Sequence, residues 1–216
     1  MGNVVIINGG DPPHASVVDH LPPHAFVIAV DHGLDHAMAL GLQPDLLVGD
    51  LDSVSVLSVR TAEERGTSIE KHPADKDATD LELALLAAAR CRPGDAVTVV
   101  SGGGGRFDHD HSVPAILAGH ARSREPVTAF IGRAKMVALR GPDATEVRGR
   151  PGSIVSLIPV GGPAIGVSIT GVRWPLRDAA LDPFAGRAIS NELSATHALV
   201  TVSFGSLLII QPEVIS

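Results

Sequence analysis

Near its start the sequence has an uninterrupted apolar run, Val4-Val5-Ile6-Ile7, which indicates a strand covered on both faces. Such strands belong to parallel sheets with helices on either side, so this short stretch decides the class of fold. Similar runs return along the first part of the chain. The predicted strands are residues 4–8, 26–30, 46–49, 68–72, 96–101 and 127–131.

Helical patterns alternate with these strands, at residues 35–42, 55–65, 79–91 and 109–121. The clearest begins at Thr79, because Thr79 and Glu82 form a capping box in which each side chain can bond to the backbone of the other. Alternating strands and helices are typical of a parallel sheet covered on both sides. We therefore predict an α/β N-terminal domain, with a mainly parallel sheet, over residues 1–133.

The pattern changes after about residue 135, where helical periodicity disappears and strand-like runs recur between glycines and prolines. These runs are residues 136–139, 154–158, 166–169, 198–204 and 207–210. Short strands at such spacing favour an antiparallel sandwich. We predict a smaller all-β sandwich C-terminal domain over residues 134–216.

The composition is that of a globular protein, since 44% of the 216 residues are hydrophobic and only 19% are charged. The net charge of -7 and the 3% of aromatic residues argue against nucleic-acid binding, which usually needs a basic face or stacking platforms. Cys91 is the only cysteine, which excludes an internal disulfide and a cysteine-based zinc site. Because the sequence shows neither a signal peptide nor a membrane-length apolar run, we expect a cytoplasmic protein without membrane contact.

The first acidic motif, Gly49-Asp50-Leu51-Asp52-Ser53, directly follows a predicted strand. Ligands of open α/β sheets sit beyond the carboxyl ends of strands, and residues two apart on extended backbone point the same way. Asp50 and Asp52 therefore suit Mg²⁺, which prefers oxygen ligands. By itself the motif is equally compatible with a solvated loop in which Ser53 caps the next helix.

The second acidic motif, Asp75-Lys76-Asp77-Ala78-Thr79-Asp80, leads into a predicted helix. Helix capping alone explains Asp80, which complements the helix dipole. Asp77 is harder to explain in this way, because the capping box already satisfies the helix end. Lys76 can contact a phosphate or balance the charge of its neighbours.

The third motif is glycine-rich, Ser101-Gly102-Gly103-Gly104-Gly105-Arg106, and lies between a strand and a helix. Glycine lets the backbone approach a phosphate closely, a helix N-terminus offers free N–H groups, and Arg106 can bind phosphate oxygens in a bidentate way. A tight strand-to-helix connection would look similar. Taken together, the three motifs predict a site for Mg²⁺ and a nucleoside triphosphate.

A polar cluster in the second part, Ile189-Ser190-Asn191-Glu192, accompanies the only tryptophan, Trp174. An apolar ring with hydroxyl and amide groups nearby suits a small heteroaromatic ligand. The alternative is that Trp174 fills a core that is short of aromatic residues.

The order of these motifs resembles that of the thiamine pyrophosphokinase (thiamine diphosphokinase) family, over nearly the whole chain. The family's Gly-Asp-x-Asp-Ser, Lys-Asp-x-Thr-Asp and Gly-Gly-Arg-x-Asp-His motifs match residues 49–53, 76–80 and 104–109. Trp174 and residues 189–192 fit as well. The resemblance implies a homodimer with an α/β nucleotide domain and a β-sandwich thiamine-binding domain. It also implies an enzyme that uses Mg²⁺ and transfers pyrophosphate from ATP to the thiamine hydroxyl, releasing AMP.

The resemblance further implies roles for individual residues. The residues around metal and phosphates would be Asp50, Asp52, Asp77 and Asp80. Those acting at the polyphosphate and the reacting centre would be Arg106 and Asp108. Further nucleotide contacts would come from Asp31, Gly33, Lys76, Thr79, Gly104, Gly105 and His109. The residues near thiamine would be Trp174, Ser190 and Asn191.

One segment departs from the family pattern. After its second strand the family usually has Ala-Asp-Gly-Gly-Ala-Asn, whereas this chain has Val30-Asp31-His32-Gly33-Leu34-Asp35. His32 and Asp35 add bulk or charge where the family places nucleotide or metal. Two alternatives follow: a diphosphokinase for another heterocyclic alcohol, such as a pterin, or a non-catalytic regulator that binds nucleotide or thiamine.

Overall fold

The computed structural model describes residues 2–104 and 106–216 and divides the chain into two units. Unit 1 comprises Met1–Arg106 and Ala129–Gly132, and unit 2 comprises Phe107–Thr128 and Arg133–Ser216. The elements of unit 1 are β1 (Asn3–Ile7), η1 (Ala15–His20, a 3₁₀ helix), β2 (Phe26–Val30), α1 (Gly33–Ala39), β3 (Leu46–Gly49), α2 (Val56–Glu64), β4 (Ser68–Lys71), α3 (Asp80–Cys91) and β5 (Ala96–Ser101).

The strands of unit 1 lie in the order β4-β3-β2-β1-β5, and each neighbouring pair among them is parallel. Chain order therefore runs outward from β1 to β4 on one side and resumes with β5 on the other side of β1. The carboxyl ends of these parallel strands form one edge, where ligands of such sheets usually bind. The residues that follow β1, β2, β3 and β5 consequently meet along this edge.

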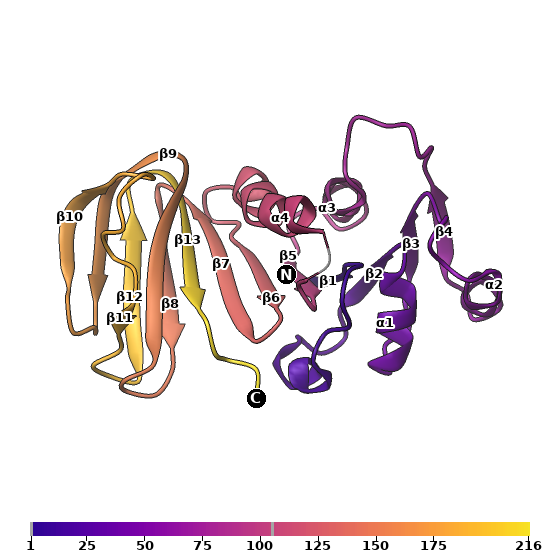
Figure 1. Cartoon of the computed structure of the whole chain (residues 1–216), viewed down its shortest axis with the longest axis horizontal. Helices are drawn as coiled ribbons and strands as arrows, with labels where there is room; N and C mark the ends of the chain where they lie inside the picture. The colour runs from indigo at the N-terminus through magenta and orange to yellow at the C-terminus, as the bar shows by residue number, and fades with distance from the viewer. Residues whose placement is uncertain (1, 105) are drawn as a thin grey trace. The chain divides into compact units, whose positions relative to one another are not determined.

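Helices cover both faces of the unit 1 sheet (Figure 1). On one face, Leu34 of α1 and Ala62 of α2 pack with Ala29 and Leu47 of the strands in a buried cluster. Helix α3 packs against β1, β2 and β3 on the opposite face. Its capping box is formed as predicted, with Thr79 and Glu82 each bonded to the backbone of the other. Burial on both faces explains why β1 and β3 are continuously apolar.

Unit 2 contains one helix and antiparallel strands. Its elements are α4 (Phe107–His120), β7 (Ala134–Arg140), β8 (Asp143–Arg148), β9 (Ile154–Thr170), β10 (Leu176–Leu181), β11 (Asn191–Glu192), β12 (His197–Val202) and β13 (Phe204–Gln211). Strand β6 (Val127–Ile131) is divided between the two units. The strands of unit 2 lie in the order β7-β13-β9-β12-β8, and β10 and β11 each pair with β9.

The long strand β9 organises unit 2, because it takes part in both of its layers (Figure 1). Its first part pairs with β13, and its second part pairs with β10 and β12. Between these parts, Gly161 and Gly162 adopt positive φ angles of 75° and 150°, which let the strand bend without steric strain. Side chains from both layers share one core, which includes Leu157, Ile169 and Leu207.

The structure corrects several predictions for the second part. Residues 154–158 and 166–169 are not separate strands but belong to β9, because the glycines between them bend the chain without ending the strand. Strands β8 and β10 were not predicted. Residues 134–216 contain only strands, as predicted, but unit 2 also includes α4, which precedes this range and packs against β7, β9 and β13. Over the whole chain the sheet is mixed, being parallel among β1–β5 and antiparallel later. No helix among the described residues combines the length and apolar character of a membrane span.

Candidate active site

Asp31 and the first acidic motif lie side by side at the carboxyl edge of unit 1. Asp31 follows β2, and its Oδ1 accepts a hydrogen bond of 3.1 Å from the backbone N–H of Leu51, which follows β3. Gly49 has φ of +148°, and a Cβ there would lie 1.8 Å from Asp31 Oδ1. Only glycine therefore lets the two turns approach this closely. Within the motif, the N–H of Asp52 donates to Asp50 Oδ1 over 3.1 Å.

The second motif reaches this edge through Lys76. Lys76 Nζ lies 2.8 Å from Asp80 Oδ1 and 3.6 Å from Asp50 Oδ2, so one ammonium serves two carboxylates. The side chains of Lys76, Asp50 and Asp80 are only 14%, 18% and 24% exposed. Shielding from water strengthens their attraction relative to that of a surface pair. Asp80 is the first residue of α3, directly after the N-cap Thr79, and Lys76 lies four residues before it in the chain.

The pKa values at this edge reflect burial and crowding of charge. Burial raises the pKa of Asp31 to about 6, and the carboxylates of Asp80 and Asp50 add to the rise. The hydrogen bond from the backbone of Asp52 lowers the pKa of Asp50 below its usual value. Burial acts to lower the pKa of Lys76, but the carboxylates of Asp80 and Asp50 outweigh it and raise that pKa. At neutral pH the edge therefore holds a compact group of opposite charges.

The glycine-rich segment follows β5 at the same edge. Ser101 folds back on it, with Oγ accepting a hydrogen bond of 3.3 Å from the N–H of Gly103. Arg106 is exposed at the end of this segment in unit 1. The predicted phosphate contact Gly105 lies outside the described residues.

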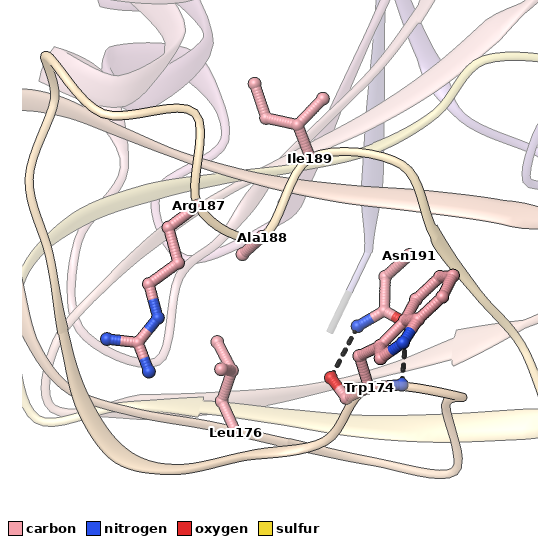
Figure 2. Close-up of a pocket in the computed structure, with 6 residues that line it drawn as sticks. All are labelled: Trp174, Leu176, Arg187, Ala188, Ile189 and Asn191. Atoms are coloured by element: carbon pink, nitrogen blue, oxygen red, sulfur yellow. Dashed lines mark hydrogen bonds between the residues drawn. The ribbon is translucent and has the colours of Figure 1, made fainter.

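Unit 2 carries a separate pocket of about 280 Å³. The lining residues are Trp174, Leu176, Arg187, Ala188, Ile189 and Asn191. Figure 2 shows Trp174 and Arg187 on opposite sides of it, with Leu176 between them along the floor. The pocket thus combines an aromatic ring, an apolar base and one cation.

Asn191 holds Trp174 in place. The Nδ2 of Asn191 donates to Trp174 O over 2.7 Å, while its Oδ1 accepts from Trp174 N over 3.1 Å (Figure 2). Asn191 is 4% exposed, so these bonds are shielded. The guanidinium of Arg173 lies 4.7 Å from the centroid of the Trp174 ring and also pairs with Glu192. Trp174 is 51% exposed and is therefore presented to solvent on a backbone that Asn191 holds.

Two family models match the chain, one over each part. The model described as "Thiamin pyrophosphokinase, catalytic domain" matches residues 19–128, and the one described as "Thiamin pyrophosphokinase, vitamin B1 binding domain" matches residues 145–209. This chain belongs to the thiamin pyrophosphokinase family. The prediction of a thiamine pyrophosphokinase, and hence of an enzyme, is confirmed.

Individual relatives in the thiamin pyrophosphokinase family extend over nearly the whole chain. A thiamine pyrophosphokinase of Bacillus subtilis is 25% identical over 215 residues, covering 98% of this chain and 99% of that protein. The crystal structure of thiamine pyrophosphokinase from Bacillus subtilis matches with a TM-score of 0.83 at 23% identity, covering 97% of this chain and 98% of that one. That of thiamin pyrophosphokinase from Geobacillus thermodenitrificans matches with a TM-score of 0.78 at 24% identity, covering 97% and 96%. At these identities the solved structures show the shared fold.

The residues predicted from the thiamine pyrophosphokinase motifs are distributed unevenly. Unit 1 brings together the side chains of Asp31, Asp50, Lys76 and Asp80. Other predicted nucleotide contacts already have local structural tasks, since Thr79 caps α3 and Gly33 is buried in α1. Leaving aside Gly105, which is not described, the remaining predicted residues of unit 1 are exposed, namely Asp52, Asp77, Gly104 and Arg106. Asp108 and His109 lie in the first turns of α4 in unit 2.

Of the three residues predicted near thiamine, Trp174 and Asn191 line the pocket of unit 2, whereas Ser190 is not among its lining residues. Instead, the backbone N–H of Ser190 donates to Ser156 Oγ over 3.0 Å. Sequence reasoning missed Arg187 and Leu176, which enter the pocket from a loop and from β10. Neither residue belongs to a recognisable motif, and only its place in the pocket beside Trp174 identifies it.

Proposed function

We propose that this chain transfers a pyrophosphoryl group from ATP to the hydroxyl of thiamine. The hydroxyl oxygen bonds to the β-phosphorus of ATP while the bond from that phosphorus to the oxygen of the α-phosphate breaks. AMP leaves with that oxygen, and the hydroxyl proton passes to a carboxylate. Such a transfer needs positioning and charge neutralisation more than covalent participation by the protein.

The observation that carries this proposal is the group formed by Asp50, Lys76 and Asp80 at the carboxyl edge of unit 1. A polyphosphate needs cations beside it, and a bound cation needs carboxylates. This group supplies both kinds of charge at one place. In the proposed arrangement Lys76 contacts phosphate oxygens, while Arg106 and Asp108 act at the reacting centre.

The residues present fit Mg²⁺ that arrives with the nucleotide. Among residues 2–104 and 106–216, no three His, Cys, Asp or Glu side chains are gathered as a preformed metal site. Magnesium usually binds through one or two carboxylates together with substrate phosphates and waters, which is what Asp50 and Asp80 offer. We propose Asp50, Asp52, Asp77 and Asp80 as the residues that hold it. Bound there, Mg²⁺ would neutralise charge on the transferred group.

We propose the pocket of unit 2 as the thiamine site. Thiamine carries heteroaromatic rings, which suit the face of Trp174, and polar ring atoms, which suit the region of Ser190 and Asn191. The Arg187 guanidinium on the opposite side is suited to the pyrophosphate that the product gains. The corresponding functional division would be residues 1–133 for nucleotide and 134–216 for thiamine. A cytoplasmic homodimer is part of the same proposal.

The test is AMP release from Mg²⁺-ATP, measured with and without thiamine, together with direct detection of thiamine diphosphate. We expect thiamine-dependent AMP from the wild type and its loss in Asp50→Ala. Asp19→Ala is the matched control, because Asp19 is an exposed carboxylate on η1 outside the proposed site. Absence of thiamine-dependent AMP from the folded wild type would refute the proposal.

A diphosphokinase for another heterocyclic alcohol is the second candidate. The specific observation in its favour is the segment after β2, where His32 Nδ1 lies 3.0 Å from Asp35 Oδ2 and the two side chains form a polar pair at the site edge. A panel of acceptors, including a hydroxymethylpterin, separates the two. Turnover of the pterin in preference to thiamine would replace the first proposal with the second.

A further inference from the structure

The segment of residues 9–11 occupies the place where the strand order of unit 1 reverses. It follows β1, which lies between β2 and β5 in the sheet, so the chain continues on one side of β1 with β2 and resumes on the other side with β5. In open α/β sheets ligands bind in the crevice at this switch point. None of the three motifs contains this segment, although it lies between their strands.

The segment is in close contact with the glycine-rich motif. The N–H of Asp11 donates to Gly103 O over 3.2 Å. A Cβ on Gly102 would lie 2.1 Å from Asp11 O, and one on Gly104 would lie 2.1 Å from Asp11 Oδ2. Because the backbone and carboxylate of Asp11 already fill these positions, the two segments can lie this close only with glycine at residues 102 and 104.

A buried histidine of α1 also contacts residues 9–11. His36 of α1 is 6% exposed, and its Nε2 lies 3.0 Å from Gly10 O. A carbonyl oxygen only accepts hydrogen bonds, so His36 Nε2 carries the hydrogen. The His32 ring packs edge-on against the His36 ring, with 4.8 Å between centroids. The segment after β2 is thereby tied to the segment after β1.

The amides of Gly9 and Gly10 remain open to a ligand. Neither N–H donates a hydrogen bond to another described residue, whereas the flanking N–H groups of Asn8 and Asp11 both do. Backbone N–H groups beside a glycine-rich loop are suited to phosphate oxygens. Residues 9–11 therefore offer two backbone hydrogen-bond donors next to the glycine-rich motif.

We propose that His36 is a positioning residue for the nucleotide: through Gly10 it holds residues 9–11, and through them the glycine-rich motif, against the polyphosphate of ATP. This inference rests on the proposed function for the identity of the ligand. It predicts that His36 affects the nucleotide half of the reaction and not the thiamine half.

The test compares His36→Leu, which removes the donor, with His36→Gln, whose side-chain amide can donate from a similar position. We expect His36→Leu to raise the KM for ATP about five- to tenfold, as for the loss of one hydrogen bond, while the KM for thiamine stays unchanged. His36→Gln should restore most of the affinity. The matched control is His120→Leu, because His120 Nδ1 also lies 3.0 Å from a backbone carbonyl, that of Ile116, but within α4.

Equal changes in both KM values, or none, would overturn the inference even if the wild type is active. If the wild type makes no thiamine diphosphate, the proposed function fails, and the equilibrium dissociation constant for Mg²⁺-ATP is measured in place of KM. The inference about His36 is then tested independently of the reaction. Unaltered ATP binding by His36→Leu, or no ATP binding by the wild type, then overturns the inference as well.

If His36→Leu does not fold, Gly102→Ala tests the same segment from its other side, because its Cβ would displace the backbone of Asp11. Gly119→Ala in α4 is its control, since no atom lies within 4 Å of the added Cβ. We expect Gly102→Ala alone to weaken ATP binding. Equal ATP affinity in the two variants would overturn the inference.

Discussion

Lys76 Nζ lies 3.6 Å from Asp50 Oδ2, so a side chain of the second acidic motif neutralises a carboxylate of the first. The two residues come from segments that follow different strands, β4 and β3. The ammonium of Lys76 offsets part of the repulsion among the carboxylates at this sheet edge. It also places a positive charge where the proposed reaction brings phosphates.

Replacing Lys76 tests this arrangement. We expect Lys76→Met to lower the free energy of unfolding in chelator by about 1–2 kcal/mol, because two shielded carboxylates lose their shared partner. Mg²⁺ should restore more stability to the variant than it adds to the wild type. The measurement is the melting temperature with chelator and with Mg²⁺, and Lys71→Met, at an exposed position on β4, serves as control. An unchanged melting temperature in chelator would show that the contact contributes nothing.

Asp31 makes stability depend on pH in a defined direction. Its folded pKa of about 6 exceeds the ordinary value of 3.8, so the folded state keeps a proton that the unfolded chain releases first. The free energy of unfolding therefore falls as pH rises through the window from about 4 to about 6. Asp31→Asn should remove this fall and should melt at a higher temperature than the wild type above pH 6.

The measurement is a series of melting temperatures in chelator from pH 4 to pH 7.5. Asn keeps an oxygen for the Leu51 N–H, so the hydrogen bond seen in the wild type can persist. Asp19→Asn, at an exposed position, should follow the wild-type curve. An Asp31→Asn curve parallel to that of the wild type would contradict the raised pKa.

Asp52→Asn separates chemistry from folding. The Asp52 side chain is exposed, and its backbone N–H, which Asn keeps, donates to Asp50, so the melting temperature should change by less than about 2 °C. If Asp52 helps to hold Mg²⁺-ATP, turnover should fall by about 100-fold or more. Thiamine-dependent AMP release and thermal melting measure the two effects. A large loss of stability with turnover preserved would make Asp52 a structural residue.

Trp174 and Asn191 should behave differently when truncated, although both line the same pocket. Trp174→Ala removes a half-exposed ring, so we expect the KM for thiamine to rise about tenfold with little change in stability. Asn191→Ala breaks the bonds that hold the Trp174 backbone and should also cost about 1–3 kcal/mol of stability. The KM for ATP is the internal control and should not change. Identical stability losses would mean that the Trp174 ring is itself a core residue.

Local patterns were sufficient for the strands of unit 1. The predicted residues 26–30, 46–49 and 96–101 coincide with β2, β3 and β5, because apolar runs bounded by turn residues leave few alternatives. Strands β8 and β10 escaped prediction because half or more of their residues are polar or exposed and they are held by pairing with β12 and β9. Such pairing joins residues far apart in the chain, and no local pattern records it.

The sequence by itself determined which residue types carry the chemistry: the acidic motifs, the glycine-rich loop and the lone tryptophan. The acidic motifs and the glycine-rich loop can be recognised because their residues are adjacent in the chain, and Trp174 because it is the only tryptophan. Only the tertiary structure decided that Lys76 meets Asp50, that Arg187 faces Trp174 across a pocket, and that His36 holds the loop after β1. These contacts arise where strand order and bends bring distant segments together, so they depend on packing and not on spacing in the chain.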